Sequence, residues 1–425
     1  MKNMFEYTYT SYPEIKSALQ ELKENLKKVG IDPTLTLFFL TGNLIKYHKS
    51  FSELLDCDSL CIPVEGFIAD QTVWSRGALV LLLDKDVNVQ KFSGTTSRIC
   101  REIGDSKKFK FNWLIYPTFY FGGRLSLLNA LIRERRFYSK YKKGDRDALK
   151  RASEFLENNF IYPINKILRP FRDRKESAIA LNIFPLEIKF GSPLISLNGR
   201  EIKRSVIRIY FKEEIKVDYS DTFPERGKSF EETLEILRNE FGENIELADI
   251  EKNGVAIGHV AGKTVLEFMS KLRELRETEK DVIKDLDTGK FFGATPYGIW
   301  FISSETYGSS FLGLFEYPLG IYPSLYDLDK FYSQSIFSFV EETKGGIEIL
   351  YEDLAQKDFD FVIVDQNYIL MYEQNIFRIA DLFKEKIGIF SLSSATSNFR
   401  YKYMTEIEEN ICLNLTRNLV YLKGF

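Results

Sequence analysis

The side chains with the clearest chemical potential follow the short apolar run 60–64, LCIPV. Glu65 and Gly66 come directly after this run, and Asp70 and Arg76 follow shortly afterwards. A short apolar run bounded by glycine and polar residues is typical of a buried strand. Open α/β sheets bind ligands at strand ends, and a carboxylate beside a guanidinium would pair with both charges of a zwitterion. The alternative is an ordinary surface ion pair.

Further positions extend this predicted ligand site. Asn43 follows another apolar run, 35–40, which also predicts a buried strand. The second half of the chain contributes candidates near the ends of its own expected strands: Tyr317, Asp365, Asn367 and Ser393. With Glu65, Gly66 and Arg76, these residues predict a binding site for a small ligand.

Enzymatic activity is not expected, and neither is a cofactor. The chain has only two histidines, His48 and His259, and no GxSxG elbow, which disfavours a hydrolytic triad. Cys57 and Cys61 with His48 nearby lack a second pair of metal ligands, so buried thiols are favoured over a metal site. Four cysteines in 425 residues form no disulfide framework.

The segment 258–264, GHVAGKT, resembles a phosphate-binding loop but is one residue short of GxxxxGK[ST]. It also follows Asn253-Gly254, which predicts a hairpin turn, whereas a phosphate loop follows a buried parallel strand. We therefore expect a turn that joins a hairpin to a helix beginning near Thr264, with no nucleotide contact by Lys263.

A basic block occupies residues 131–175, with fourteen Lys or Arg and six Asp or Glu, a net charge of +8 within a chain of net charge −3. Cations interleaved with aromatic residues suit phosphate contacts and base stacking. The candidates for binding RNA or a ribosome are Arg133, Arg135, Arg136, Tyr138, Lys140, Lys142, Lys143 and Arg146. The alternative is a solvated helical insertion whose aromatic residues pack inward.

The elements that must position these residues alternate between strands and helices. The sequence predicts a helix over 13–29, strands over 35–40, 60–64, 78–83, 87–92 and 111–116, and helices from 124 to about 171. Further strands are expected at 179–184, 299–303, 311–315, 347–350, 359–365 and 387–392. Helices are expected at 229–240, from 264 to about 286, and near 325–341 and 373–386.

These elements predict an α/β fold: a two-part protein of mixed sheets flanked by helices, with Asn-Gly hairpins and a basic helical insertion over about 124–175. Asn198-Gly199 predicts a type I′ hairpin turn. The polar linker 224–228 predicts a boundary between parts 1–223 and 224–425. A strand, a helix and a second strand occur near each end of the chain, at 35–64 and 359–392, which indicates a repeated architecture.

Several stretches resemble FIST-domain proteins, named for F-box and intracellular signal transduction. Residues 61–68, CIPVEGFI, are similar to the family's cysteine-to-Gly-Glu-Ile segment, and Gly262-Lys263 match its turn from a hairpin into a helix. Residues 317–320, YPLG, are similar to its Tyr/Phe-Pro-Leu-Gly segment, whereas 388–394 lack the glutamate expected there. The resemblance covers about 34–93 and 190–395.

The resemblance implies a non-enzymatic sensory protein that binds a small, amino-acid-like ligand. A regulatory or stress factor that docks on a ribosome or RNA through residues 131–175 is the alternative. The N-terminal residues contain no apolar signal core, and no apolar run approaches membrane-spanning length. We therefore expect a cytoplasmic protein with no membrane partner.

Overall fold

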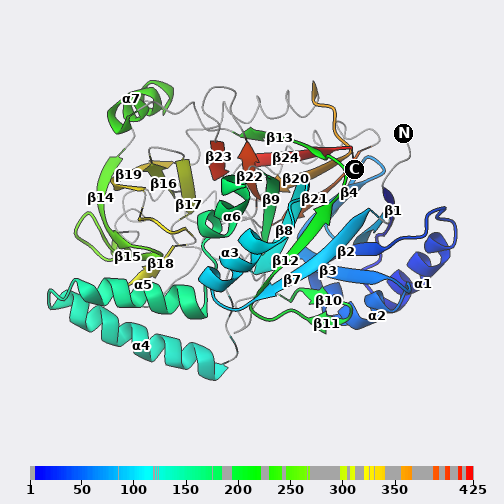
Figure 1. The fold of residues 1–425 in the computed structure, drawn as a ribbon, viewed down its shortest axis with the longest axis horizontal. Coiled ribbons are helices and arrows are strands. Elements are labelled where there is room, and N and C mark those ends of the chain that lie inside the picture. Colours follow the sequence, from blue (N-terminus) through cyan, green and yellow to red (C-terminus); the bar gives the residue numbers. More distant parts are fainter. Residues whose placement is uncertain are drawn as a thin grey trace, which may run out of the picture.

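Figure 1 shows the computed structural model of the chain. It describes residues 5–424 except 85, 118–119, 121, 123, 175, 184–193, 222–228, 242–245, 266, 269–296, 304–306, 312–319, 325, 330, 340–355, 366–385, 392–397, 403–409 and 414–417. Within these residues, three mixed sheets and seven α-helices form a mixed α/β protein, as the sequence predicts. The predicted linker 224–228 lies outside the described residues, so the division into two parts stays a prediction.

The first sheet has the strand order β1-β6-β2-β3-β10-β11. Its strands are β1 (Phe5–Thr10), β6 (Ala78–Leu83), β2 (Leu35–Thr41), β3 (Asp58–Val64), β10 (Ser196–Leu197) and β11 (Arg200–Glu201). β2 and β3 are parallel, which confirms the predicted strand–helix–strand unit. Both faces of β2 are buried: Leu37 and Phe39 belong to one core cluster, and Phe38 and Leu40 to another. Burial on both faces explains why this strand is a continuous apolar run.

A second six-stranded sheet has the order β13-β24-β20-β21-β4-β5. Its strands are β13 (Lys216–Asp221), β24 (Asn418–Lys423), β20 (Phe361–Asp365), β21 (Ile387–Ser391), β4 (Gly66–Ala69) and β5 (Thr72–Trp74). β20 and β21 are parallel, and β24 pairs antiparallel with β20 just as β6 does with β2. The strand pairing of the predicted repeat is therefore confirmed, although the sequences of the two units differ. The helix expected between β20 and β21 lies outside the described residues.

Each six-stranded sheet is completed by a hairpin from a distant part of the chain. The β4–β5 hairpin lies between β3 and β6 in sequence, yet β4 pairs with β21 near the other end of the chain. The β10–β11 hairpin pairs with β3 of the first sheet. The β4–β5 hairpin is therefore an exchanged hairpin, which joins N-terminal and C-terminal segments through backbone hydrogen bonds. The β10–β11 hairpin comes from the middle of the chain, at residues 196–201.

The turns of the two hairpins have the same geometry. Asn198 and Gly199 have φ values of 50° and 69°, which confirms the predicted type I′ turn. Asp70 and Gln71 have φ values of 49° and 60°, so β4 and β5 are joined by the same type of turn. This second turn contains no glycine, so the sequence does not predict the hairpin.

The third sheet has twelve strands in the order β18-β15-β14-β19-β16-β17-β23-β22-β9-β8-β12-β7. Its early strands are β7 (Val87–Ser93), β8 (Phe111–Pro117), β9 (Ser177–Ile183) and β12 (Ser205–Phe211). Its later strands are β14 (Glu246–Asn253), β15 (Ala256–Val260), β16 (Tyr297–Ser303), β17 (Tyr307–Phe311), β18 (Tyr322–Pro323), β19 (Phe331–Phe339), β22 (Asn398–Lys402) and β23 (Asn410–Leu413). The sheet therefore also combines segments from both halves of the chain.

Helices cover the outer faces of the sheets. On the first sheet lie α1 (Ile15–Leu26), the 3-10 segment η1 (Gly42–Tyr47) and α2 (His48–Ser52). On the twelve-stranded sheet lie α3 (Thr96–Asp105), α5 (Asp147–Asn159) and α6 (Ile164–Asp173), with α4 (Arg124–Lys142) packed against α5. α7 (Phe230–Phe241) precedes β14 (Figure 1). A central apolar layer, which includes Trp113 and Phe361, fills the space between the sheets.

The predicted helix near 325–341 is wrong, because residues 331–339 form β19. β19 pairs antiparallel with both β14 and β16, so its backbone groups are satisfied on two sides. Four phenylalanine and tyrosine side chains in nine residues suit such a central strand better than a helix. The strand predicted at 347–350 and the helix near 373–386 lie outside the described residues.

A buried arginine joins several elements of the twelve-stranded sheet. Arg208 on β12 has no exposed surface, and its guanidinium donates to Asn112 Oδ1 at 2.7 Å and Ser106 Oγ at 2.6 Å. It also forms an ion pair with Glu176 at 3.2 Å. Breaking a buried pair of this kind typically costs about 3–5 kcal/mol, because the remaining charge is left without its partner.

The helix α4 is held against the C-terminal half of the chain by three side chains on one face. Glu134 accepts a hydrogen bond from the backbone of Ile321 at 3.0 Å. Tyr138 covers Gly320, where a Cβ atom would lie 2.2 Å from its ring. Tyr141 covers Gly258 in the same way and hydrogen bonds to His259 at 3.0 Å. The insertion is therefore packed by its acidic and aromatic residues, while its cations face outward.

We predict that Glu134 makes stability pH-dependent. Burial raises the pKa of Glu134 to about 8, so the folded state favours its protonated form. The stability contributed by this proton is fully present below the unfolded pKa and is lost as the pH rises through the folded value. Glu134→Gln should therefore gain stability relative to wild type between about pH 5 and pH 8, by at most about 1.4 kcal/mol per pH unit.

Chemical denaturation across this pH range measures the difference. The exposed Glu154→Gln on α5 is the matched control and should follow the wild-type curve. Parallel pH dependence of wild type and Glu134→Gln would contradict the prediction.

Candidate functional site

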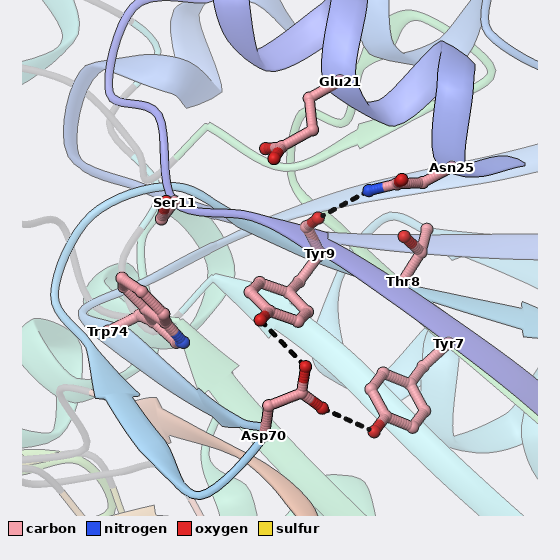
Figure 2. Close-up of a pocket in the computed structure, with 8 residues that line it drawn as sticks. All are labelled: Tyr7, Thr8, Tyr9, Ser11, Glu21, Asn25, Asp70 and Trp74. Carbon is pink, nitrogen blue, oxygen red and sulfur yellow. Dashed lines mark hydrogen bonds between the residues drawn. The ribbon is translucent and has the colours of Figure 1, made fainter.

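A cavity of about 440 Å³ lies between β1, α1 and the β4–β5 hairpin (Figure 2). It is lined by Tyr7, Thr8, Tyr9, Ser11, Glu21, Asn25, Asp70 and Trp74. We call this cavity the junction pocket, because β1 belongs to the first six-stranded sheet whereas β4 and β5 belong to the second. Its size lies within the range of small-molecule sites.

Local periodicity brings the lining residues together. Tyr7 and Tyr9 are two residues apart on β1 and therefore point to the same side of the strand. Glu21 and Asn25 are four residues apart on α1 and therefore share one face of the helix. Asp70 occupies the first position of the hairpin turn, where aspartate tolerates a positive φ better than most residues do.

Two tyrosines hold the carboxylate of Asp70. The Tyr7 hydroxyl donates to Asp70 Oδ1 at 3.2 Å, and the Tyr9 hydroxyl donates to Asp70 Oδ2 at 2.9 Å (Figure 2). Burial, followed by the hydrogen bond and the charge of Asp70, raises the pKa of Tyr9 to about 12. Tyr9 therefore remains a neutral phenol at physiological pH and serves as a hydrogen-bond donor. These contacts join the hairpin turn to the edge strand of the other sheet.

Aromatic rings form one wall of the junction pocket. The ring centroids of Tyr9 and Trp74 are 5.9 Å apart, and both rings pack near the fully buried Phe67. The indole Nε1 of Trp74 donates to the carbonyl oxygen of Ala69 at 3.4 Å. Because the ring of Trp74 is anchored by packing and a hydrogen bond, this wall is largely preformed.

Glu21 is an exception to the well-paired polar groups of the pocket. Its Oε2 atom is buried and has no hydrogen-bond partner among the described residues. Figure 2 shows its carboxylate directed from α1 toward β1. Asn25, one helical turn later, donates instead to the backbone oxygen of Tyr9 at 3.5 Å. A buried carboxylate oxygen without a donor is costly unless a ligand or water supplies one.

The predicted residues of the first half lie at strand ends, outside the lining of the junction pocket. Asn43 is exposed on η1 after β2 and accepts a hydrogen bond from Lys46 at 2.6 Å. Glu65 separates β3 from β4, and its backbone N–H donates to Phe390 at 3.0 Å. Arg76 is exposed in the segment between β5 and β6.

Gly66 begins β4 and lies opposite Phe390 of β21. A Cβ atom at Gly66 would lie 2.8 Å from the carbonyl oxygen of Trp74, so glycine permits close strand packing at this position. This contact assigns Gly66 a packing role within the exchanged hairpin. Its role in ligand binding stays a prediction.

The predicted residues of the second half are only partly described. Asp365 ends β20 and its backbone lies opposite Ser391 of the parallel strand β21. Tyr317, Asn367 and Ser393 lie outside the described residues.

Asp70 is a residue that the sequence predicts for a ligand site, whereas the residues that surround it are not predicted. Tyr7, Tyr9, Glu21 and Trp74 carry no recognisable motif, and Tyr7 and Asp70 are 63 residues apart. The only signal was the alternation of aromatic and polar residues in residues 5–10, FEYTYT, which is typical of a half-exposed strand.

The basic block separates its cations from its aromatic residues. The predicted cations are all exposed: Arg133, Arg135, Arg136, Lys140, Lys142, Lys143 and Arg146. By contrast, Tyr141 is buried, and Phe137 and Tyr138 pack against the core. The structure therefore leaves a cationic surface along α4 but does not offer these aromatic residues as stacking platforms.

The segment 258–264 joins the hairpin β14–β15 to a helix that begins at Val265, as the sequence predicts. Val260 and Lys263 exchange backbone hydrogen bonds of 2.8 and 3.0 Å, and Ala261 N–H donates to Asp249. These N–H groups are the kind that a phosphate loop would direct at its ligand. Here they are already engaged within the protein.

Thr264 and Glu267 form a capping box at the start of this helix. The Glu267 side chain accepts from Thr264 N–H at 2.9 Å, and the Thr264 hydroxyl accepts from Glu267 N–H at 3.2 Å. The two bonds satisfy N–H groups that a helix start would otherwise leave unpaired.

Within the described part of the chain, no cluster of three potential metal ligands is present. The thiol of Cys61 lies 3.6 Å from the backbone oxygen of His48, and burial raises its pKa to about 11. Cys57 lies beside Thr36 instead. No described helix is long and apolar enough to span a membrane.

The fold and the pocket define a mixed α/β protein in which a hairpin from the N-terminal part of the chain completes a C-terminal sheet and borders a small cavity. A family model described as AF0772-like protein C-terminal domain matches residues 231–343. A protein of Archaeoglobus fulgidus (strain ATCC 49558 / DSM 4304 / JCM 9628 / NBRC 100126 / VC-16), described as "Uncharacterized protein", is 38% identical over 366 residues. This match spans 85% of this chain and 99% of the relative. The chain therefore belongs to the AF0772-like protein family.

We predict that Thr264, and not Lys263, stabilises the turn at 258–264. Thr264→Ala should lower the free energy of unfolding by about 1 kcal/mol, because it removes one half of the capping box. Lys263→Ala, the matched neighbour, should change it by less than about 0.5 kcal/mol. Chemical denaturation measures both values. Magnesium-dependent ATP binding that disappears in Lys263→Ala would contradict the absence of a phosphate site.

Proposed function

We propose that the protein is a non-enzymatic sensory protein, related to FIST-domain proteins, that binds a small ligand in the junction pocket. The observation that carries the proposal is the carboxylate of Asp70, which lines a cavity with an aromatic wall and is held there by Tyr7 and Tyr9. Preorganised polar groups beside aromatic walls are characteristic of ligand sites. This pocket takes the place of the strand-end site as the primary candidate, while ligand contacts by Asn43, Glu65 and Arg76 stay predictions.

Binding is favoured over catalysis by the chemistry of the lining. The eight lining residues include no histidine, cysteine, lysine or arginine. The phenol of Tyr9 is held neutral by its raised pKa, so it is a poor general base near pH 7. The lining offers hydrogen bonds, charge and aromatic surface, which suit recognition.

The position of the pocket suits a sensor. A ligand there would contact β1 and α1 of one sheet and, through Asp70 and Trp74, a hairpin that belongs to the other sheet. Such a ligand would stabilise one arrangement of the two sheets, which is the physical requirement for a ligand-dependent signal. Reduced thiols at Cys57, Cys61 and Cys100 suit the cytoplasmic setting that forms part of this proposal.

We predict that ligands of the pocket raise the melting temperature and that Asp70→Asn weakens this effect. Asparagine tolerates the positive φ of this turn but removes the negative charge. A thermal-shift screen against amino acids and other small metabolites identifies the ligand, since a ligand at 100 times its Kd stabilises by about 2.7 kcal/mol.

Gln71→Asn is the matched control, because Gln71 shares the turn but does not line the pocket. It should keep the wild-type response. The proposal fails if no compound shifts folded protein, or if every shift persists unchanged in Asp70→Asn.

A second candidate function is docking on RNA or a ribosome through α4. The exposed cations along α4 and the following turn favour it, whereas the inward packing of Tyr138 and Tyr141 removes the stacking contribution. Binding would therefore depend mainly on phosphate neutralisation and would weaken steeply with salt.

We predict that reversing four of these charges, at Arg135, Arg136, Lys142 and Lys143, abolishes any co-sedimentation with ribosomes at low salt. Each lost phosphate contact should lower the salt dependence, the slope of log K against log salt, by about 0.7 for single-stranded RNA. Reversal of four exposed lysines of the α1 region, at positions 16, 23, 27 and 28, is the matched control. Equal sedimentation of both variants would remove α4 as the docking surface.

A further inference from the structure

We infer that the junction pocket recognises a small organic cation, such as an alkyl amine or a quaternary ammonium compound. This inference rests on the proposed function, which supplies the ligand site but not the charge of its ligand. The residues that carry it are Glu21 and Asp70, with the aromatic rings of Tyr9 and Trp74.

The charge of the lining has a single sign. Glu21 and Asp70 are its two ionisable carboxyl groups, and none of the eight lining residues is a cation. A zwitterion or an anion would place its carboxylate against these groups without a guanidinium or ammonium partner. Repulsion between like charges in a partly enclosed site therefore selects against such ligands.

Glu21 supplies an unused acceptor. Glu21 lines the cavity, and its buried Oε2 atom lacks a hydrogen-bond partner among the described residues. An ammonium group donates up to three hydrogen bonds and carries the charge that a carboxylate pairs with best. A primary amine in the cavity would therefore satisfy the acceptor that the described residues leave open.

Among the described residues, hydrogen bonds occupy only part of the acceptor capacity of Asp70. Each of its oxygens accepts one hydrogen bond from a tyrosine, whereas a carboxylate offers about four acceptor positions. The two phenols orient the group without cancelling its charge, because Tyr9 is a neutral donor. Asp70 is thus a positioned anion that lines the same cavity as Glu21. In Figure 2 the two carboxylates lie on opposite sides of β1.

The aromatic wall provides the third contact. Tyr9 and Trp74 present rings 5.9 Å apart with an interplanar angle of 35°. A cation on the cavity side of these rings would lie near both π-systems. A cation over such a ring gains about 0.5–2 kcal/mol, with tryptophan the best partner. Aromatic rings combined with carboxylates recognise alkylated ammonium groups, which are poorly hydrated and need no exact hydrogen-bond geometry.

Matched ligand pairs test the charge directly by isothermal titration calorimetry on the full chain. One pair is choline and its uncharged isostere, in which carbon replaces the quaternary nitrogen. The other is cadaverine and pentanediol of the same chain length. At least one cation should bind ten times more tightly than its neutral partner, which corresponds to about 1.4 kcal/mol.

Variants locate the binding site. Glu21→Gln and Asp70→Asn should each weaken binding of the cation about tenfold, and Trp74→Leu should weaken choline more than cadaverine. Gln71→Asn should bind as wild type does. Melting temperatures of all variants establish that each is folded, so that a loss of binding reports on the pocket.

The outcomes separate this inference from the proposed function. If neutral or anionic metabolites bind in the pocket and neither choline nor cadaverine does, the cation inference is wrong and the ligand-binding function stands. Unchanged binding of the cation by Glu21→Gln would likewise overturn the cation inference alone. If no compound from either experiment binds folded protein, both proposals are wrong.

Discussion

The pairing of β4 with β21 is the constraint on which the candidate site depends. Its backbone hydrogen bonds place the β4–β5 hairpin, which follows β3 in sequence, in a sheet built mainly from the C-terminal half of the chain. The turn of this hairpin then lies beside β1, where Tyr7 and Tyr9 bind Asp70. Without this exchange the carboxylate would lie on a local loop, and the cavity between the two sheets would lose one wall.

The β10–β11 hairpin completes the first sheet with a turn of the same type. Asn198, at the first turn position of β10–β11, accepts from Ser59 N–H at 2.7 Å and donates to Asp58 at 2.8 Å. Asp70 has the equivalent turn position in β4–β5 and bonds to tyrosines of the other sheet. In both hairpins a short polar side chain at positive φ joins the turn to a neighbouring strand. One of the two turns does this beside a cavity, and that difference makes it a candidate site.

The side chains of the basic insertion form two sets, one packed against the protein and one exposed to solvent. Its acidic and aromatic residues, Glu134, Tyr138 and Tyr141, pack against glycines and backbone of residues matched by the AF0772-like C-terminal model. Its cations consequently face solvent. A helix whose period is 3.6 residues separates the two sets on opposite faces even though they alternate along the sequence. Alternation in a helical sequence therefore does not imply that cations and rings act together.

Local pattern alone determined the buried strands, the parallel units near both ends, the type I′ turn at Asn198-Gly199 and the turn before Thr264. Each depends on residues close in sequence: continuous apolar runs, φ preferences of Asn and Gly, and the spacing of a capping box. Tertiary structure decided that residues 331–339 form a strand, because pairing on both sides outweighed local preference. The junction pocket also forms only in the tertiary structure. Tyr9 and Asp70 are 61 residues apart and meet only through strand pairing between distant segments. Sequence spacing carries no information about such a contact, because its geometry is set by the register of two sheets and not by either peptide.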